Sequence, residues 1–117
     1  MNICLSKLIV ASTDRVMSFN FFSFIFDADI EKDSEGVEHI RIDSIRVYFD
    51  LNIKPRIKSF GFILGLSNFE ELSNFKQKLK LAYYKDAVKP KIMNESDSFI
   101  EFKDPSGNLW RTEIYKP

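Results

Sequence analysis

The amino-acid sequence predicts an α+β protein made of two units with the same order of elements: strand, helix and then three strands. Two observations predict this class. Apolar and β-branched runs typical of strands are interrupted by two segments with helical spacing, and the second half of the chain repeats the order of the first. A length of 117 residues suits one domain that buries its core without disulfides. We expect a single domain over 1–117, with one unit over 1–54 and another over 55–117.

The first unit is predicted to open with a strand over 3–11, because this segment is apolar and rich in β-branched residues. Residues 12–14, Ser-Thr-Asp, offer helix-capping side chains, and apolar residues then recur at helical spacing from Val16 to Phe26. Such a helix is apolar nearly all round. We expect Phe19, Phe22 and Phe26 in the core and Phe21 or Phe24 towards a second subunit or a pocket. The remaining predicted elements are a short strand over 27–32, a turn over 33–36 and a hairpin with strands over 37–42 and 45–51.

The second unit is predicted to repeat this plan. A strand over 60–66 precedes two overlapping capping boxes, Ser67 with Glu70 or Asn68 with Glu71, and either pair can start a helix. Three strands then follow, over 88–93, 98–103 and 109–115. The helix is expected to bury one stripe and to leave its lysines in solvent. The buried stripe is Leu72, Phe75 and Leu79, and the solvated residues are Lys76, Lys78 and Lys80.

The most distinctive motif is the Asp-Pro-Ser-Gly-Asn turn over 104–108. Pro105 presets φ, Asp104 and Asn108 can hydrogen-bond back to the chain, and Gly107 suits a positive φ. This turn, together with the tandem units, resembles the vicinal-oxygen-chelate superfamily, which includes glyoxalase I, bleomycin-resistance proteins, fosfomycin-resistance enzymes and extradiol dioxygenases. The resemblance implies a curved mixed sheet with helices on its outer face and a concave cleft.

Metal-dependent members of this superfamily bind their metal through His, Glu or Gln, His and Glu from four strands. The resemblance places Lys7, Gly61 and Arg111 at three of these positions and Tyr48 at the fourth. Protonated lysine and arginine have no free lone pair, glycine has no side chain, and one tyrosine binds a divalent metal poorly. We therefore predict no metal and no other cofactor.

Strand alternation places Arg46 and Asp50 on the same face as Tyr48, and Glu113 on the same face as Arg111. We expect these groups to bind a small organic molecule, for which an anion is one candidate, and Gly61 and Gly65 to leave the cleft room. Internal pairing of Arg111 with Glu113 or Asp50, with Lys7 in solvent, is the open alternative. The predicted ligand-binding residues are Lys7, Arg46, Tyr48, Asp50, Gly61, Arg111 and Glu113.

Two other functions remain open. One is a metal-dependent lyase or dioxygenase with a displaced site built from His39, Asp50 and Glu113. The other is an interaction protein with a vestigial cleft, whose Phe-rich helix binds a partner. No serine or cysteine nucleophile can be matched with a base in a chain that has one histidine, so no catalytic residue is predicted and an enzyme is disfavoured.

Charge and hydropathy give no sign of a nucleic-acid or membrane partner, and cysteine content bears on the location of the protein. The chain has 17 basic and 17 acidic residues, which gives no sign of a nucleic-acid partner. The longest apolar-rich stretch, 16–26, is too short to span a bilayer, and no signal peptide is recognised. Cys4 is the single cysteine. It is expected beside the buried face of the first strand, without special reactivity, and it favours a cytoplasmic protein. The resemblance also implies a homodimer.

Overall fold

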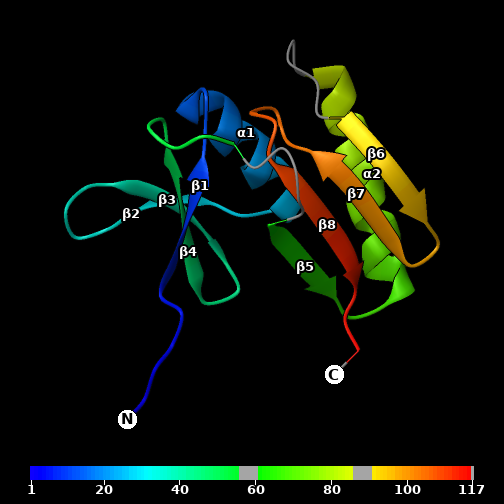
Figure 1. Ribbon diagram of the computed structural model, residues 1–117, viewed down its shortest axis with the longest axis horizontal. Coiled ribbons are helices and arrows are strands. Elements are labelled where there is room, and N and C mark those ends of the chain that lie inside the picture. Colours follow the sequence, from blue (N-terminus) through cyan, green and yellow to red (C-terminus); the bar gives the residue numbers. More distant parts are fainter. Residues whose placement is uncertain (56–60, 86–90, 117) are drawn as a thin grey trace. The chain divides into compact units, whose positions relative to one another are not determined.

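The computed structural model describes residues 1–55, 61–85 and 91–116, and the backbone alone of 83–85. The chain divides into two compact units, Met1–Lys54 and Pro55–Pro117. In the described chain, each unit has one helix and one four-stranded mixed sheet (Figure 1). The predicted α+β class, with tandem βαβββ units, is confirmed.

The first unit has the strand order β1-β4-β3-β2. Strands β1 and β4 are parallel, and the other neighbouring pairs are antiparallel. Parallel neighbours need a long connection between them, which the elements from α1 to β3 supply. In chain order the elements are β1 (Lys7–Ala11), α1 (Arg15–Phe26), β2 (Ile30–Lys32), β3 (Glu38–Ile42) and β4 (Ile45–Asp50).

Helix α1 begins and ends where its sequence predicts. The Asp14 side chain accepts a hydrogen bond from the Met17 amide at 3.1 Å, which satisfies one of the free donors at the helix start. Asp27 ends the helix in the left-handed region, at φ 53°. Phe19 and Phe22 pack on Phe49 of β4, with ring centroids 5.0 and 5.3 Å away. The alternate residues of β4 therefore face the helix.

The expectation that Phe21 or Phe24 faces a second subunit or a pocket is wrong for Phe21. Phe21 is only 1 % exposed and makes an edge contact with Phe22, so it does not present a ring to a second subunit. A wide apolar stripe on a helix can bury two neighbouring positions, such as Phe21 and Phe22. Helical spacing alone therefore did not predict that Phe21 is buried. Phe24 is half-buried, and Phe26 is half-buried and stacked on Phe22.

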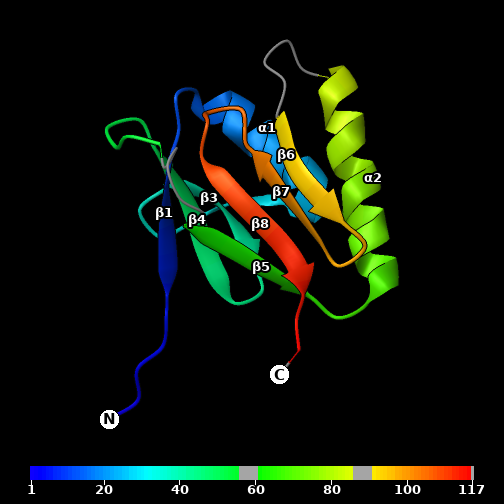
Figure 2. The ribbon, with the colours of Figure 1, turned by 45° about the vertical axis from the view of Figure 1, so that its right-hand side comes forward.

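The second unit has the strand order β5-β8-β7-β6, with β5 and β8 parallel. Figure 2 shows α2 running alongside this sheet. Asn68 caps the helix by accepting from the Glu71 amide at 2.9 Å, so the second predicted pair supplies the cap. The Glu71 carboxylate does not close a capping box with Asn68, because it accepts from the Ser67 amide at 3.1 Å. In chain order the elements are β5 (Phe62–Leu66), α2 (Phe69–Lys85), β6 (Lys91–Ser96), β7 (Phe99–Lys103) and β8 (Leu109–Ile114).

Several boundaries and exposures differ from the prediction. Strand β1 starts at Lys7, and Cys4 is exposed in the segment before it rather than beside a buried face. Strand β6 extends to Ser96, whereas residues 88–90 of its predicted start lie outside the described residues. Lys76 is not solvated, because its ammonium donates to the Ser96 carbonyl and lies 3.8 Å from Glu95. No helix in the described residues is long and apolar enough to cross a membrane.

The buried core of each unit lies between its helix and its sheet. The predicted stripe of α2 is buried as expected, and Ala82 extends it by one turn. The buried apolar residues of the first unit are Val10, Ala11, Phe19, Phe21, Phe22, Ile25, Ile40, Val47 and Phe49. Those of the second unit are Leu72, Phe75, Leu79, Ala82, Ile100, Phe102, Leu109 and Trp110.

The turn over 104–108 is organised by the buried carboxylate of Asp104. One oxygen accepts from the Ser106 and Asn108 amides, each at 2.9 Å. The other accepts from the Asn108 side chain at 2.8 Å and from the Trp110 indole at 2.9 Å. Burial raises the pKa of Asp104, and these hydrogen bonds oppose that shift. Gly107 has the predicted positive φ, 94°. The motif is therefore a structural clamp on Trp110.

We predict that Asp104→Ala lowers the free energy of unfolding by about 3 kcal/mol, because four donors lose a buried acceptor. Asp97→Ala is the matched control. This aspartate is exposed in the turn between β6 and β7, and its loss should cost less than about 0.5 kcal/mol. Urea denaturation followed by Trp110 fluorescence measures both changes. Equal effects of the two substitutions would contradict the clamp.

Candidate functional site

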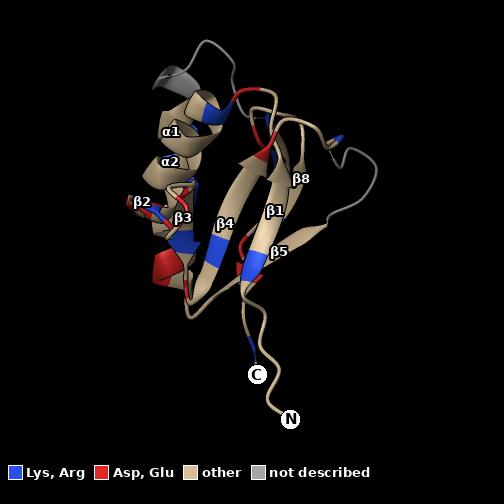
Figure 3. Cartoon of the chain, turned by 90° about the vertical axis from the view of Figure 1, so that its left-hand side faces the viewer, with Lys and Arg blue, Asp and Glu red and all other residues tan. Residues whose placement is uncertain are grey.

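Each sheet has one face covered by its helix and one opposite face. In β4, Val47 and Phe49 are buried under α1, so Arg46, Tyr48 and Asp50 lie on the opposite face. The parallel register places Lys7 of β1 beside Arg46, and the opposite face of the first unit therefore carries the predicted candidates of that unit. Figure 3 shows the basic segments of β1 and β4 side by side.

Lys7 and Arg46 are neighbouring cations without acidic partners. Within the described ranges, neither side chain forms an ion pair with a carboxylate. The Lys7 ammonium lies 5.4 Å from the centroid of the Tyr48 ring. Both side chains are exposed, so water rather than protein screens their repulsion. An anion placed between them would relieve it.

These residues border a hollow of about 770 Å³ on the same unit. Asp50 does not line it, and its carboxylate instead accepts from the Asn52 amide at 2.8 Å. Arg41, which sequence analysis missed, does line it. The register of β3 and β4 pairs Arg41 with Arg46, so the alternation of the predicted hairpin could have found it. The lining residues are Cys4, Leu5, Ser6, Lys7, Asp33, Ser34, Glu35, Arg41, Ser44, Arg46 and Tyr48.

The Tyr48 hydroxyl is held in place by Asp33, a second residue that the sequence did not single out. It donates to one Asp33 oxygen at 2.8 Å, while the other oxygen accepts from the Glu35 and Val37 amides, each at 2.9 Å. The pKa of Asp33 is lowered, first by the Val37 amide and then by Tyr48, and the pKa of Tyr48 is raised by the same bond. This bond ties the β2–β3 turn to β4 and fixes the ring beside Lys7.

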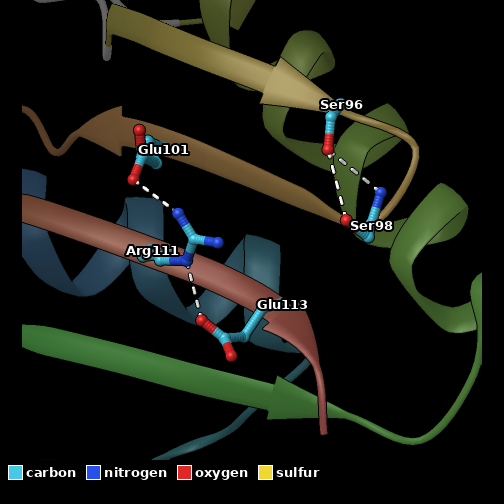
Figure 4. A network of polar contacts seen from close by, with 5 residues as sticks. All are labelled: Ser96, Ser98, Glu101, Arg111 and Glu113. Carbon is cyan, nitrogen blue, oxygen red and sulfur yellow. Dashed lines mark hydrogen bonds and ion pairs between the residues drawn. The ribbon is translucent and has the colours of Figure 1, made fainter.

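Arg111, in the second unit, differs from Lys7 and Arg46 because it is paired with carboxylates. Its Nε donates to Glu113 at 2.7 Å and its terminal nitrogen to Glu101 at 2.8 Å (Figure 4). The guanidinium also lies 4.1 Å from the Phe99 ring centroid. The two carboxylates raise the pKa of Arg111. Internal pairing with Glu113, the alternative left open by the sequence, is what the structure shows, and Glu101 opposite Arg111 in β7 is the partner that was missed.

The two glycines of the predicted cleft do not both leave space. Gly61 is exposed and lies just before β5. A Cβ at Gly65 would stand 2.7 Å from the Cβ of Tyr115, so glycine is needed there to admit that side chain. The expectation that Gly65 keeps a ligand cleft open is therefore wrong.

His39 is buried rather than exposed. It is 1 % exposed, its ring lies 5.2 Å from that of Tyr48, and its Nε2 is 3.8 Å from Glu31. Its ring nitrogens have no hydrogen-bond partner in the part of the chain that the structure describes. The same part contains no group of three or more His, Cys, Asp or Glu placed to hold a metal ion, so a displaced site from His39, Asp50 and Glu113 gains no support.

Comparison with known proteins supports this fold. The sequence matches no protein-family model and no curated protein. Solved structures do match over nearly the whole chain. The fosfomycin resistance protein FosX from Listeria monocytogenes has a TM-score of 0.72 at 17% identity, covering 99% of this chain and 94% of its own. This chain has the vicinal-oxygen-chelate fold.

Two further matches support that fold. A glyoxalase/bleomycin resistance protein from Albidiferax ferrireducens has a TM-score of 0.69 at 13% identity, covering 96% of this chain and 98% of its own. The oxidase ChaP-H2 has a TM-score of 0.68 at 15% identity, covering 99% of this chain and 96% of its own. Identities this low show a shared fold only.

The residues that the resemblance places at metal positions do not fit a metal. Lys7 presents an ammonium, Arg111 is a guanidinium already bonded to two carboxylates, and Gly61 offers no side chain. None of these three residues offers a side-chain lone pair to a divalent metal.

We predict that Arg111→Gln lowers the free energy of unfolding by about 1 kcal/mol, because Glu101 and Glu113 then lie close together without a cation. Adding Glu101→Gln to this variant should recover part of the lost free energy of unfolding. A double-mutant cycle in urea, at low and high salt, measures the coupling between Arg111 and Glu101. Additive effects at low salt would show that the network does not stabilise the fold.

Proposed function

We propose that this protein binds a small organic anion in the hollow on the face of the first sheet opposite α1, without a metal. The observation that carries the proposal is the Lys7–Arg46 pair, two adjacent cations with no carboxylate partner among the described residues. An enzyme that uses the superfamily's metal site is disfavoured by the side chains at those positions.

The chemistry of the hollow supports an oxyanion as ligand. Arg46 can donate two parallel hydrogen bonds to a carboxylate, phosphate or phosphonate, and Lys7 adds a point charge beside it. Tyr48 is fixed by its bond to Asp33, and the hydroxyls of Ser6 and Ser44 also border the hollow. A prearranged set of donors loses little conformational freedom when a ligand binds.

One structural relative supports the same class of ligand. One structure of FosX from Listeria monocytogenes contains Mn(II) and dihydroxypropylphosphonic acid. In this protein the cations of Lys7 and Arg46 would supply the positive charge for the anion. The proposal includes a cytoplasmic homodimer, which the superfamily resemblance and the exposed single cysteine favour.

Isothermal titration calorimetry with phosphonoacetate, malonate and benzoate tests the proposal. We expect at least one anion to bind, and Lys7→Gln with Arg46→Gln to weaken its binding by about tenfold or more, because charge-assisted hydrogen bonds are lost. Both residues are exposed, so the fold should survive.

Lys91→Gln with Lys116→Gln is the matched control, since it removes two exposed cations from the second unit. It should leave the affinity within about twofold. Equal weakening by both double variants would mean that net charge, rather than this hollow, determines binding. Absence of binding by every anion, with the fold intact, would overturn the proposal.

A further inference from the structure

A second hollow, of about 600 Å³, lies in the first unit between α1 and the β2–β3 hairpin. Its lining differs from that of the anion hollow. The helix contributes Arg15, Val16 and Phe19, and the hairpin contributes Ile30 and Val37. Volumes of this size with apolar walls and few polar groups are typical of sites for small molecules.

The rim of this hollow is apolar and exposed to solvent. Val16 is 69%, Val37 46% and Ile30 43% exposed, although all three are branched aliphatic residues. The floor is formed by the buried rings of Phe19 and Phe49. Exposed apolar side chains around an apolar floor would gain free energy by covering a ligand's hydrocarbon surface.

Arg15 gives the apolar hollow one oriented cation. Its Nε donates to the Phe49 carbonyl at 3.0 Å, which fixes the plane of the guanidinium. Across the described residues it forms no ion pair with a carboxylate. Its two terminal nitrogens therefore keep their donors for a ligand, in the fork that suits a carboxylate. Arg15 also opens α1, where the helix dipole favours a negative charge.

Two acidic groups lie near this cation. Asp14 accepts from the Met17 amide as the helix cap. Glu38 lines the hollow. Lys32 lies directly opposite Glu38 in the β2–β3 register, so Glu38 has a cation as its cross-strand neighbour. Arg15 forms an ion pair with neither of these carboxylates, which makes an acid a better match for the hollow than an amine.

We infer that this hollow is a second ligand site, which takes an amphipathic carboxylate whose hydrocarbon lies between α1 and the hairpin and whose carboxylate meets Arg15. The inference does not depend on the anion site, because the two hollows are lined by different cations. Tyr48 borders both hollows, and its hydroxyl donates to Asp33 of the hairpin turn.

Titration with phenylbutyrate, its neutral amide and phenylbutylamine, followed by amide NMR shifts, tests this inference. We expect the acid to bind most tightly and to shift amides of 15–20 and 36–38. Arg15→Gln should lower the affinity for the acid by about tenfold, to that of the amide. The affinity for the amide should stay unchanged. Val16→Asp, at an exposed position, should weaken both the acid and the amide.

Lys7→Gln with Arg46→Gln serves as the control for the other hollow and should leave phenylbutyrate binding unchanged. Three outcomes would overturn the inference: acid binding that survives Arg15→Gln, tighter binding of the amine than of the acid, or loss of binding in the control variant. The last outcome would assign the acid to the anion site and leave the proposed function standing. Failure of the anion site alone would leave this second site untouched.

Discussion

The alternation of the two central strands is the constraint on which the rest of this structure depends. Over 46–49 of β4 and 110–113 of β8, alternate side chains are buried, and the residues between them are left on the opposite face. The buried residues of these stretches are Val47 and Phe49 in β4, and Trp110 and Thr112 in β8. The charged residues of both strands therefore lie on the face opposite the helix.

The two units use that face differently. In the second unit, Arg111 has carboxylate partners, because it lies between Glu101 and Glu113. In the first unit, Lys7 and Arg46 are adjacent and have none in the described chain. Paired charges stabilise a surface, whereas unpaired neighbouring charges of one sign cost free energy until a ligand neutralises them. The contrast between Arg111 and the Lys7–Arg46 pair is therefore the physical basis for the proposal that the first unit binds an anion.

The fold could be predicted from the sequence because its signals are local. Asp14 and Asn68 cap their helices through their own side chains, and Gly107 takes the positive φ that its turn requires. The superfamily fold followed from the order of these elements. Strand ends were less accurate, because the end of β1 or β6 is set by the length of the neighbouring strand and not by its own residues.

The site was predictable only in part. Alternation along one strand placed Arg46 and Tyr48 together, and the structure brings Lys7 beside them. Partners from neighbouring strands depend on register, which single-strand patterns do not specify, and so Glu101 and Arg41 were missed. Gly65 was misinterpreted for the same reason, since the Tyr115 side chain that fills its space follows a different strand.

The Nε–H signals of the arginines in an NMR spectrum, recorded with and without phosphonoacetate, test the central contrast most directly. Arg111 donates from Nε to Glu113, so its signal should be protected from solvent exchange and should not respond to the anion. The Arg46 signal should exchange rapidly in the free protein and should shift and sharpen as the anion is added. A shift of the Arg111 signal with no change at Arg46 would contradict the account, because it would place the anion on the unit whose charges are already paired.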